Sequence, residues 1–292
     1  MQVLPEQVWR ERAAAHTAAV ERLSADRLAR RVEGRTHPVD DFLWEYYAFR
    51  PAQLARWHPG AGVGLQRAPE RADWSFYAVA DGTAYLDTET FGRRRGRAVA
   101  FVRDLLTATL SRPGRYGCFG LHEWAMVYRA EGDQVRHGGW PLRLGAAGTD
   151  RVVESHTLAC SHFDAYRFFT PPAAPLNSLT PTREGQLGLE QPGCLHAGMD
   201  LYKWCFKLSP AVPGELTLEA FALARDIREL DMRAAPYDLR ELGYEPVRIE
   251  TAEGKAEYVE AQRRFTARSN ALRRRLLDVL DTLPAAASTL AR

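Results

Sequence analysis

Residues 194–208, CLHAGMDLYKWCFKL, are the strongest indication of the fold. Apolar side chains occupy most positions, which is typical of a helix buried on nearly all sides. Four titratable side chains interrupt this pattern at intervals of four, three and four residues: His196, Asp200, Lys203 and Lys207. This spacing places them along one face of a helix. Because a buried charge is costly unless it is paired or used, the segment predicts a buried helix with an internal ion pair or a functional site.

The sequence on both sides of this segment predicts further helices and one β element. Helical patterns cover residues 5–33, 39–49, 88–111, 216–232 and 253–283, and another helix begins near Cys118. A β-hairpin is expected at 74–87, with Asp81-Gly82 as its turn, and a short strand at 247–251. We therefore expect a mainly α (α+β) chain. It forms a single domain, residues 1–292, whose N-terminal helix 5–33 and C-terminal helix 253–283 pack on a core of 37–250.

The connecting segments differ in how clearly they can be assigned. Glycine-rich 56–64 and proline-rich 171–188 are expected to lack regular structure, and 131–150 is rich in turn residues. Residues 152–169 are ambiguous between strand and helix, because short apolar runs fit both.

Composition indicates a soluble globular protein. The chain has 292 residues, of which 46% are hydrophobic and 26% charged, with a net charge of +2. No apolar run approaches the roughly 20 residues that span a bilayer, and the N-terminal segment carries charges where a signal peptide is apolar. We expect a cytoplasmic protein without a membrane partner. The four cysteines form no CxxC pair, which excludes a finger-type zinc site and favours buried apolar roles.

The charged face of 194–208 permits two interpretations. Asp200 with Lys203 or Lys207 would form a purely structural ion pair. Alternatively, Lys203 with a lowered pKa would be a Schiff-base nucleophile, or a lysine would contact a substrate phosphate while Asp200 activates water. Glycine-rich and proline-rich loops flank the segment, as they often flank sites, and this favours a functional role.

Residues 154–169, ESHTLACSHFDAYRFF, contain a possible metal or base site. In a strand, alternate side chains point to the same side, namely His156, Cys160, His162 and Asp164. Two imidazoles and a carboxylate can bind zinc or iron, or a histidine can orient an aspartate base. In a helix only His156 and Cys160 would stack, and the prediction of a metal would weaken.

Two further segments carry candidate residues. In HEWAMVYR (122–129), His122 and Arg129 share a helical face, but the second histidine of the zinc-protease signature is absent, so a structural pair is the alternative. The aromatic residues of 42–60 could form a pocket for a flat ligand such as a nucleobase, or they could be core. His58, in a glycine-rich loop, is the residue least expected in a core.

Several long motifs resemble those of a bacterial family usually labelled 3-methyladenine DNA glycosylase. The resemblance extends from about residue 37 to 265 and rests on these blocks: HPVDDFLWEYYAFRPAQLARWHPG (37–60), GCFGLHEWAMVYR (117–129), ESHTLACSHFDAYRFFTPPAAPLN (154–177), EQPGCLHAGMDLYKW (190–204), LDMRAAPYDL (230–239) and PVRIETAEGKAEYV (246–259). It implies base-excision repair of DNA damage, in which an alkylated purine is flipped out of DNA and its N-glycosidic bond is hydrolysed.

The first hypothesis is therefore an N-glycosidic hydrolase whose partner is DNA or a purine nucleoside-type substrate, with no required cofactor. Asp164 or Asp200 would supply the carboxylate, Lys203 and Arg129 the cationic contacts, and His162 and His196 would orient groups or relay protons. The candidate substrate contacts are Trp44, Tyr47, Trp57, His58, Glu123, Arg129 and Asn177.

The second hypothesis is a metal-dependent enzyme acting on a small molecule. Its divalent metal would take ligands from His156, His162 and His196 in the first place, with His122, Glu123 and Asp200 as further candidates. A non-catalytic nucleic-acid or protein-binding module is the third alternative.

Overall fold

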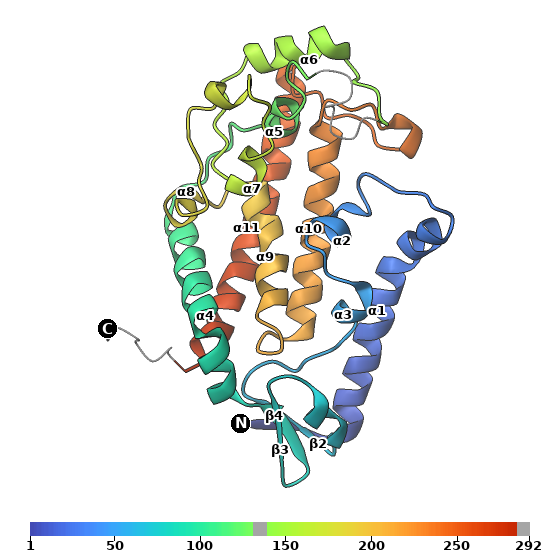
Figure 1. Ribbon diagram of the computed structural model, residues 1–292, viewed down its shortest axis with the longest axis vertical. Helices are drawn as coiled ribbons and strands as arrows, with labels where there is room; N and C mark the ends of the chain where they lie inside the picture. The colour runs from blue at the N-terminus through green and yellow to red at the C-terminus, as the bar shows by residue number, and fades with distance from the viewer. Residues whose placement is uncertain (131–138, 285–292) are drawn as a thin grey trace. The chain divides into compact units, whose positions relative to one another are not determined.

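The computed structural model describes residues 1–130 and 139–284, and it confirms a mainly helical protein with a small sheet (Figure 1). The chain divides into two compact units. Unit 1 comprises Met1–Thr107, Asp200–Ala222 and Ala271–Arg292, and unit 2 comprises Ala108–Met199 and Leu223–Asn270. Four helices, α4, α9, α10 and α11, contribute residues to both units. The single-domain organisation stays a prediction.

Unit 1 begins with a small sheet and a long helix. Its helices are α1 (Glu6–Val32), α2 (Phe42–Tyr46), α3 (Pro51–Leu54), the 3₁₀ helix η1 (Pro69–Asp73) and most of α4 (Thr88–Ser111). Its strands are β1 (Gln2–Leu4), β2 (Val63–Gln66), β3 (Tyr77–Ala80) and β4 (Thr83–Leu86). The predicted helices at 5–33, 39–49 and 88–111 are confirmed, although the second is shorter than expected.

The four strands form one sheet in the order β1-β2-β4-β3. The predicted hairpin is confirmed, since β3 and β4 pair antiparallel around Asp81 and Gly82, which have positive φ angles of 48° and 71°. Such angles suit the tight turns that match strand twist. β2 begins at Val63, inside the segment that was expected to be irregular, and pairs parallel with β1. Pairing with distant strands, which no local pattern reveals, explains this error.

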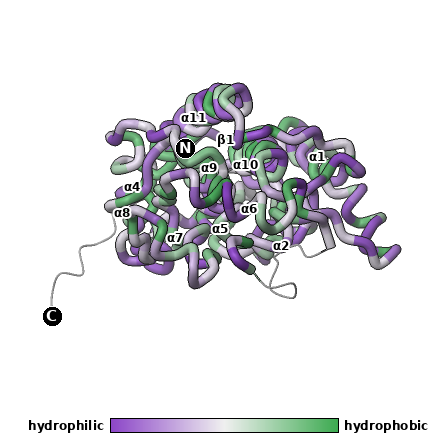
Figure 2. The backbone as a smooth tube through the Cα atoms, turned by 90° about the horizontal axis from the view of Figure 1, so that it is seen from above, coloured by the Kyte–Doolittle hydropathy of each residue, from purple (hydrophilic) through white to green (hydrophobic). Residues whose placement is uncertain are grey.

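The sheet lies against the N-terminal end of α1 (Figure 1), where Trp9 Nε1 donates a hydrogen bond of 2.9 Å to the Gln66 carbonyl. The buried residues of α1 recur on one side of the helix, as amphipathic packing requires: Trp9, His16, Val20 and Ser24. In Figure 2, hydrophobic and hydrophilic segments alternate along α1 and α11.

Unit 2 combines short helices with the last residues of α4 and with parts of three other long helices. The short elements are α5 (Leu121–Ala125), α6 (Gly145–Glu154), α7 (Phe163–Tyr166), α8 (Gln186–Leu189) and the 3₁₀ helices η2 (Ala174–Leu176) and η3 (Arg240–Leu242). The long helices are α9 (Leu195–Lys207), α10 (Gly214–Ala234) and α11 (Ala252–Asp281). These three confirm the helices predicted at 194–208, 216–232 and 253–283.

Two local predictions in unit 2 were wrong, and a third segment fits neither of the two alternatives left open for it. Residues 247–251 form no strand, and 249–251 are a turn followed by a bend. Residues 145–150 belong to α6, although 131–150 was expected to be turn-rich; 131–138 lie outside the described residues. Residues 152–169 form neither one strand nor one helix, because α6 ends at Glu154 and only 163–166 are helical again.

Within residues 1–130 and 139–284, every helix is too short or too polar to cross a lipid bilayer.

Candidate functional site

Helix α5 carries His122 and Glu123 into the interior of unit 2. Gly120 precedes the helix with a left-handed φ of 70°, a conformation that glycine adopts without steric cost. Trp124 Nε1 donates a hydrogen bond of 2.9 Å to the carbonyl of Ala234 at the end of α10. This bond and the complete burial of Trp124 fix α5 against the C-terminal end of α10.

Helices α9 and α10 approach each other closely at Gly198. A Cβ atom at this position would lie 2.7 Å from Ser269 Oγ and 2.9 Å from Ile227 Cδ1, so a larger residue would force the helices apart. His196 lies two residues before Gly198, and Asp231 lies one turn after Ile227. The close packing therefore brings a histidine of α9 near an aspartate of α10.

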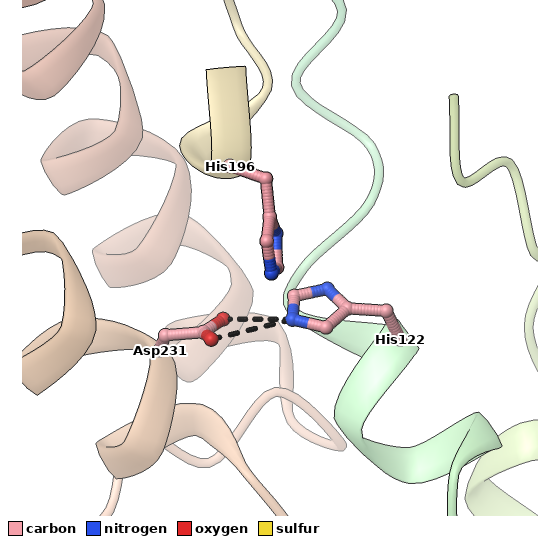
Figure 3. A group of neighbouring side chains, drawn as sticks. All are labelled: His122, His196 and Asp231. Atoms are coloured by element: carbon pink, nitrogen blue, oxygen red, sulfur yellow. Dashed lines mark hydrogen bonds and ion pairs between the residues drawn. The ribbon is translucent and has the colours of Figure 1, made fainter. Parts of the chain in front are cut away.

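His122, His196 and Asp231 form a buried group, the His–Asp cluster (Figure 3). His122 Nε2 lies 3.1 Å from Asp231 Oδ1 and 3.3 Å from Oδ2. The rings of His122 and His196 meet edge to face, with centroids 4.5 Å apart. One ligand atom from each residue can be chosen so that all lie within 4.8 Å of one another, the single such group among the described histidine, cysteine and acidic residues.

A second layer of charge holds Asp231 in place. Arg228 Nη1 donates to Glu123 Oε1 at 2.8 Å and to Asp231 Oδ2 at 3.3 Å. Arg228 is 1% exposed and Glu123 is 4% exposed. Two carboxylates and one guanidinium sum to a charge of −1, so this buried set favours one additional positive charge, either a proton on an imidazole or a cation.

The pKa values of His122 and Asp231 agree with this charge balance. Burial by itself would lower the pKa of His122, but the adjacent Asp231 carboxylate outweighs it and raises the pKa above its usual value. Burial would raise the pKa of Asp231, yet His122 and the other nearby cations hold that pKa well below its usual range. His122 therefore retains a proton more readily than an ordinary histidine, and a metal would have to displace it.

A cavity of about 220 Å³ adjoins the His–Asp cluster. His122 and His196 line it, together with Cys118, Cys160, Cys194 and Tyr258, and with apolar side chains such as Leu121 and Phe169. Burial raises the pKa of Cys160 to about 12 and raises the pKa values of Cys118 and Cys194 as well. These thiols stay protonated near neutral pH, which makes them weak nucleophiles and weak ligands.

The histidines predicted from 154–169 are only partly brought together. His162 is buried beside His196, with ring centroids 5.2 Å apart. His156 lies at the end of α6, where its Nδ1 is 2.6 Å from the Val152 carbonyl. Asp164 lies 3.5 Å from Arg167. Of the three leading metal candidates, His196 alone belongs to the cluster, because the segment is not a strand and its side chains do not share a face.

The charged face of α9 does not form one site. Asp200 belongs to unit 1, where it accepts a hydrogen bond of 2.9 Å from Tyr47 Oη and pairs with the Lys203 ammonium. We name these three residues the Asp200 cluster. Neither Asp200 nor Lys203 lines the cavity beside His196. The geometry of Asp200 and Lys203 matches the structural ion-pair interpretation of this helix.

The remaining candidates have varied surroundings. Trp44 and Trp57 are core residues with 5% and 1% exposure. Arg129 forms an exposed ion pair of 2.8 Å with Glu154. Asn177 holds two loops together, accepting from the Cys160 amide at 2.8 Å and donating to the Cys160 carbonyl at 3.0 Å. His58 lines a groove in unit 1.

Asp231 and Arg228 were not identified from the sequence. They lie in ALARDIRELDM (222–232), where the charges resemble the solvated face of an amphipathic helix. The sequence feature that could have identified them is their spacing of three residues, which lets the two side chains pair on a helix. The helix buries most of its surface, so such a pair is buried with it.

Searches of protein-family models, curated proteins and solved structures found no match to this chain.

Proposed function

We propose that the His–Asp cluster binds a divalent transition metal, zinc or iron, and that the chain is a metal-dependent enzyme acting on a small molecule. One observation carries this proposal: two imidazoles and a carboxylate, all buried, have ligand atoms within 4.8 Å of one another beside a cavity. Cytoplasmic localisation and a nucleic-acid partner remain predictions from the sequence.

The donor set favours a catalytic metal over a structural one. Catalytic zinc commonly has three protein ligands and one open position, and two histidines with one carboxylate also bind non-haem iron. His122 and His196 line the cavity, so a molecule within it would lie next to the metal. A metal there could polarise a substrate oxygen or lower the pKa of a bound water.

The residues around the ligands support the same role. Metal-binding sites depend on outer partners that orient the ligands, and removing one commonly weakens metal affinity by about 10- to 100-fold. Arg228 has this position, since it contacts Asp231 Oδ2 at 3.3 Å and is itself held by Glu123 at 2.8 Å.

The cavity limits the substrate to a small compound. Its volume of about 220 Å³ is below the roughly 300–1,000 Å³ of pockets for drug-sized ligands. Most lining side chains are apolar, while Arg115 and Gln191 add polar groups. A small, largely apolar molecule with one polar or anionic group fits this lining.

Elemental analysis of the protein, purified without a histidine tag and without chelator, tests the proposal. We expect about one zinc or iron per chain, and less than about one tenth of that in His196→Ala. His156→Ala is the matched control, because it removes an imidazole of unit 2 that lies outside the cluster, and it should keep the wild-type content. Metal-free wild-type protein that also fails to take up added Zn²⁺ or Fe²⁺ would contradict the proposal.

An N-glycosidic hydrolase is the second candidate, favoured by the contact of 3.1 Å between His122 and Asp231 beside the cavity. A histidine oriented by a carboxylate can transfer a proton as general acid or base, and the cavity would receive the flipped base. Alkylated duplex DNA separates the two candidates. Free base released by the wild-type protein in the presence of EDTA, but not by Asp231→Asn, would favour the hydrolase. No release by the wild-type protein, with or without EDTA, counts against it.

A further inference from the structure

A second cavity, in unit 1, has a different character from the one beside the His–Asp cluster. This groove has a volume of about 670 Å³, within the usual range for small-molecule sites. Its lining includes three cations, four aromatic residues and one histidine, among them Arg56, Arg95, Lys207, Trp74, Phe76 and His58. Cationic and aromatic side chains thus dominate its wall.

The charge of the lining favours an anion. Arg56, Arg95 and Lys207 are exposed, and Asp73 is the one acidic residue among the described lining residues, so three cations and one carboxylate sum to +2. Arg56 and Arg95 form no ion pair with any carboxylate that the structure describes. Their guanidinium groups therefore remain available for an anionic ligand such as a phosphate.

The aromatic side chains of the groove favour a flat ring. Phe49 and Phe206 stack on each other with centroids 3.8 Å apart and an interplanar angle of 18°. Arg71 packs on the Trp74 ring, with its Cζ 3.7 Å from the ring centroid. Phe76 has a left-handed φ of 68°, a costly conformation for a bulky residue that is often found at ligand sites.

His58 adds a polar group without charge. Its Nδ1 lies 3.0 Å from Tyr77 Oη, and burial together with Arg71 lowers the pKa of His58 to about 3. The imidazole is therefore neutral near pH 7 and can exchange hydrogen bonds with a ligand.

We propose that this groove binds a nucleoside phosphate. Arg56, Arg95 and Lys207 contact the phosphate, and the aromatic side chains stack on the base, as in other sites that combine cations with aromatic platforms. The proposal does not depend on the metal site, since the groove and the His–Asp cluster have no residue in common.

Calorimetric titration of the full chain with three compounds tests the two parts of this recognition. AMP carries both the ring and the phosphate, adenosine only the ring, and ribose 5-phosphate only the anion. We expect saturable binding of AMP, with adenosine and ribose 5-phosphate each at least tenfold weaker. Equal binding of AMP and ribose 5-phosphate, or no saturable binding of AMP up to millimolar concentration, would overturn the proposal.

A nucleoside phosphate can be a free nucleotide or part of a DNA strand, and a four-nucleotide oligomer of deoxyadenosine distinguishes these sources. Tighter binding of AMP assigns the groove to free nucleotides. Tighter binding of the oligomer assigns it to a strand, and either result supports the proposed chemistry.

Variants locate the binding in the groove. Arg95→Gln and Lys207→Gln should each weaken AMP binding roughly tenfold, the effect of losing one charge-assisted hydrogen bond at a partly exposed site. Arg94→Gln is the matched control, because Arg94 is an exposed neighbour on α4 that does not line the groove. Thermal unfolding shows whether each variant is folded. Unchanged affinity in folded Arg95→Gln and Lys207→Gln, or an equal loss in Arg94→Gln, contradicts the assignment.

Discussion

The His–Asp cluster and the Asp200 cluster both bury charge and both include side chains of α9, yet they differ in how that charge is balanced. In the Asp200 cluster one carboxylate is matched by the Lys203 ammonium and by the hydroxyl of Tyr47, so its charge is neutralised within the protein. Around the His–Asp cluster two carboxylates share one guanidinium, and two imidazoles lie beside them next to a cavity. The Asp200 cluster thus balances its charge with its own side chains, whereas the His–Asp cluster requires a proton on an imidazole or a cation to reach the same balance.

Exchanging aspartate for asparagine in each cluster should give the largest difference between the clusters, measured as Zn²⁺ affinity. Asp231→Asn removes an anionic ligand and should weaken Zn²⁺ affinity by more than about 100-fold, whereas Asp200→Asn should change it less than about twofold. Competition titration against a chromogenic chelator measures both. Equal losses in the two variants would show that the clusters do not differ as described.

The free energy of unfolding of the metal-free protein should show how much the Asp200–Lys203 ion pair matters to the fold. Asp200→Ala leaves the Lys203 ammonium largely buried, and removing one partner of such a pair costs about 3–5 kcal/mol. We expect a loss near the lower end, because the Lys203 side chain is 13% exposed. Urea unfolding measures it.

The double variant Asp200→Ala/Lys203→Met is the control for that measurement. It removes both charges and should recover most of the stability that Asp200→Ala loses. A double variant no more stable than Asp200→Ala would show that the lost energy does not come from the Lys203 ammonium left without the Asp200 carboxylate.

The pH dependence of stability should report on the His–Asp cluster. The folded-state pKa of His122 is raised by Asp231, so this pair stabilises metal-free protein fully below the unfolded-state value of about 6.5. The stabilisation is lost as pH rises through the raised folded-state pKa. Urea unfolding between pH 6 and 9 should show this loss in wild type and in Asp200→Asn, and His122→Gln should remove it. A slope that persists in His122→Gln would assign the effect to another group.

The smallest expected effect is that of Tyr47→Phe. The substitution deletes one hydroxyl that donates to Asp200 Oδ1 at 2.9 Å and should cost about 1.5 kcal/mol, typical of a hydrogen bond to a charged group. Metal affinity should stay at the wild-type value. An effect on Zn²⁺ binding in the chelator competition would mean that the Asp200 cluster supports the metal site after all.

The sequence was informative where local pattern determines structure. The apolar residues and charge spacing of 194–208 predicted α9, and Asp81-Gly82 predicted the hairpin turn, because helix faces and tight turns depend on neighbours in the chain. The same helical spacing also suggested one site from His196 to Lys207. Eleven residues of helix rise about 16 Å, too far for both ends to reach one small cavity.

The composition of the candidate site depended on tertiary packing and was only partly predictable. His122 and His196 attracted attention because titratable residues are unusual in apolar segments. Asp231 did not, since its role arises from the close contact of α9 with α10 at Gly198 and from the anchoring of α5 by Trp124. No spacing within the chain encodes that convergence.

Anomalous diffraction from crystals of metal-loaded, untagged protein tests the central claim most directly. With data collected on both sides of the absorption edge of the bound metal, we predict one strong anomalous peak about 2.0–2.2 Å from a nitrogen of His122, a nitrogen of His196 and a carboxylate oxygen of Asp231. A peak elsewhere in the chain, or no peak among these three side chains in fully loaded protein, would contradict the claim.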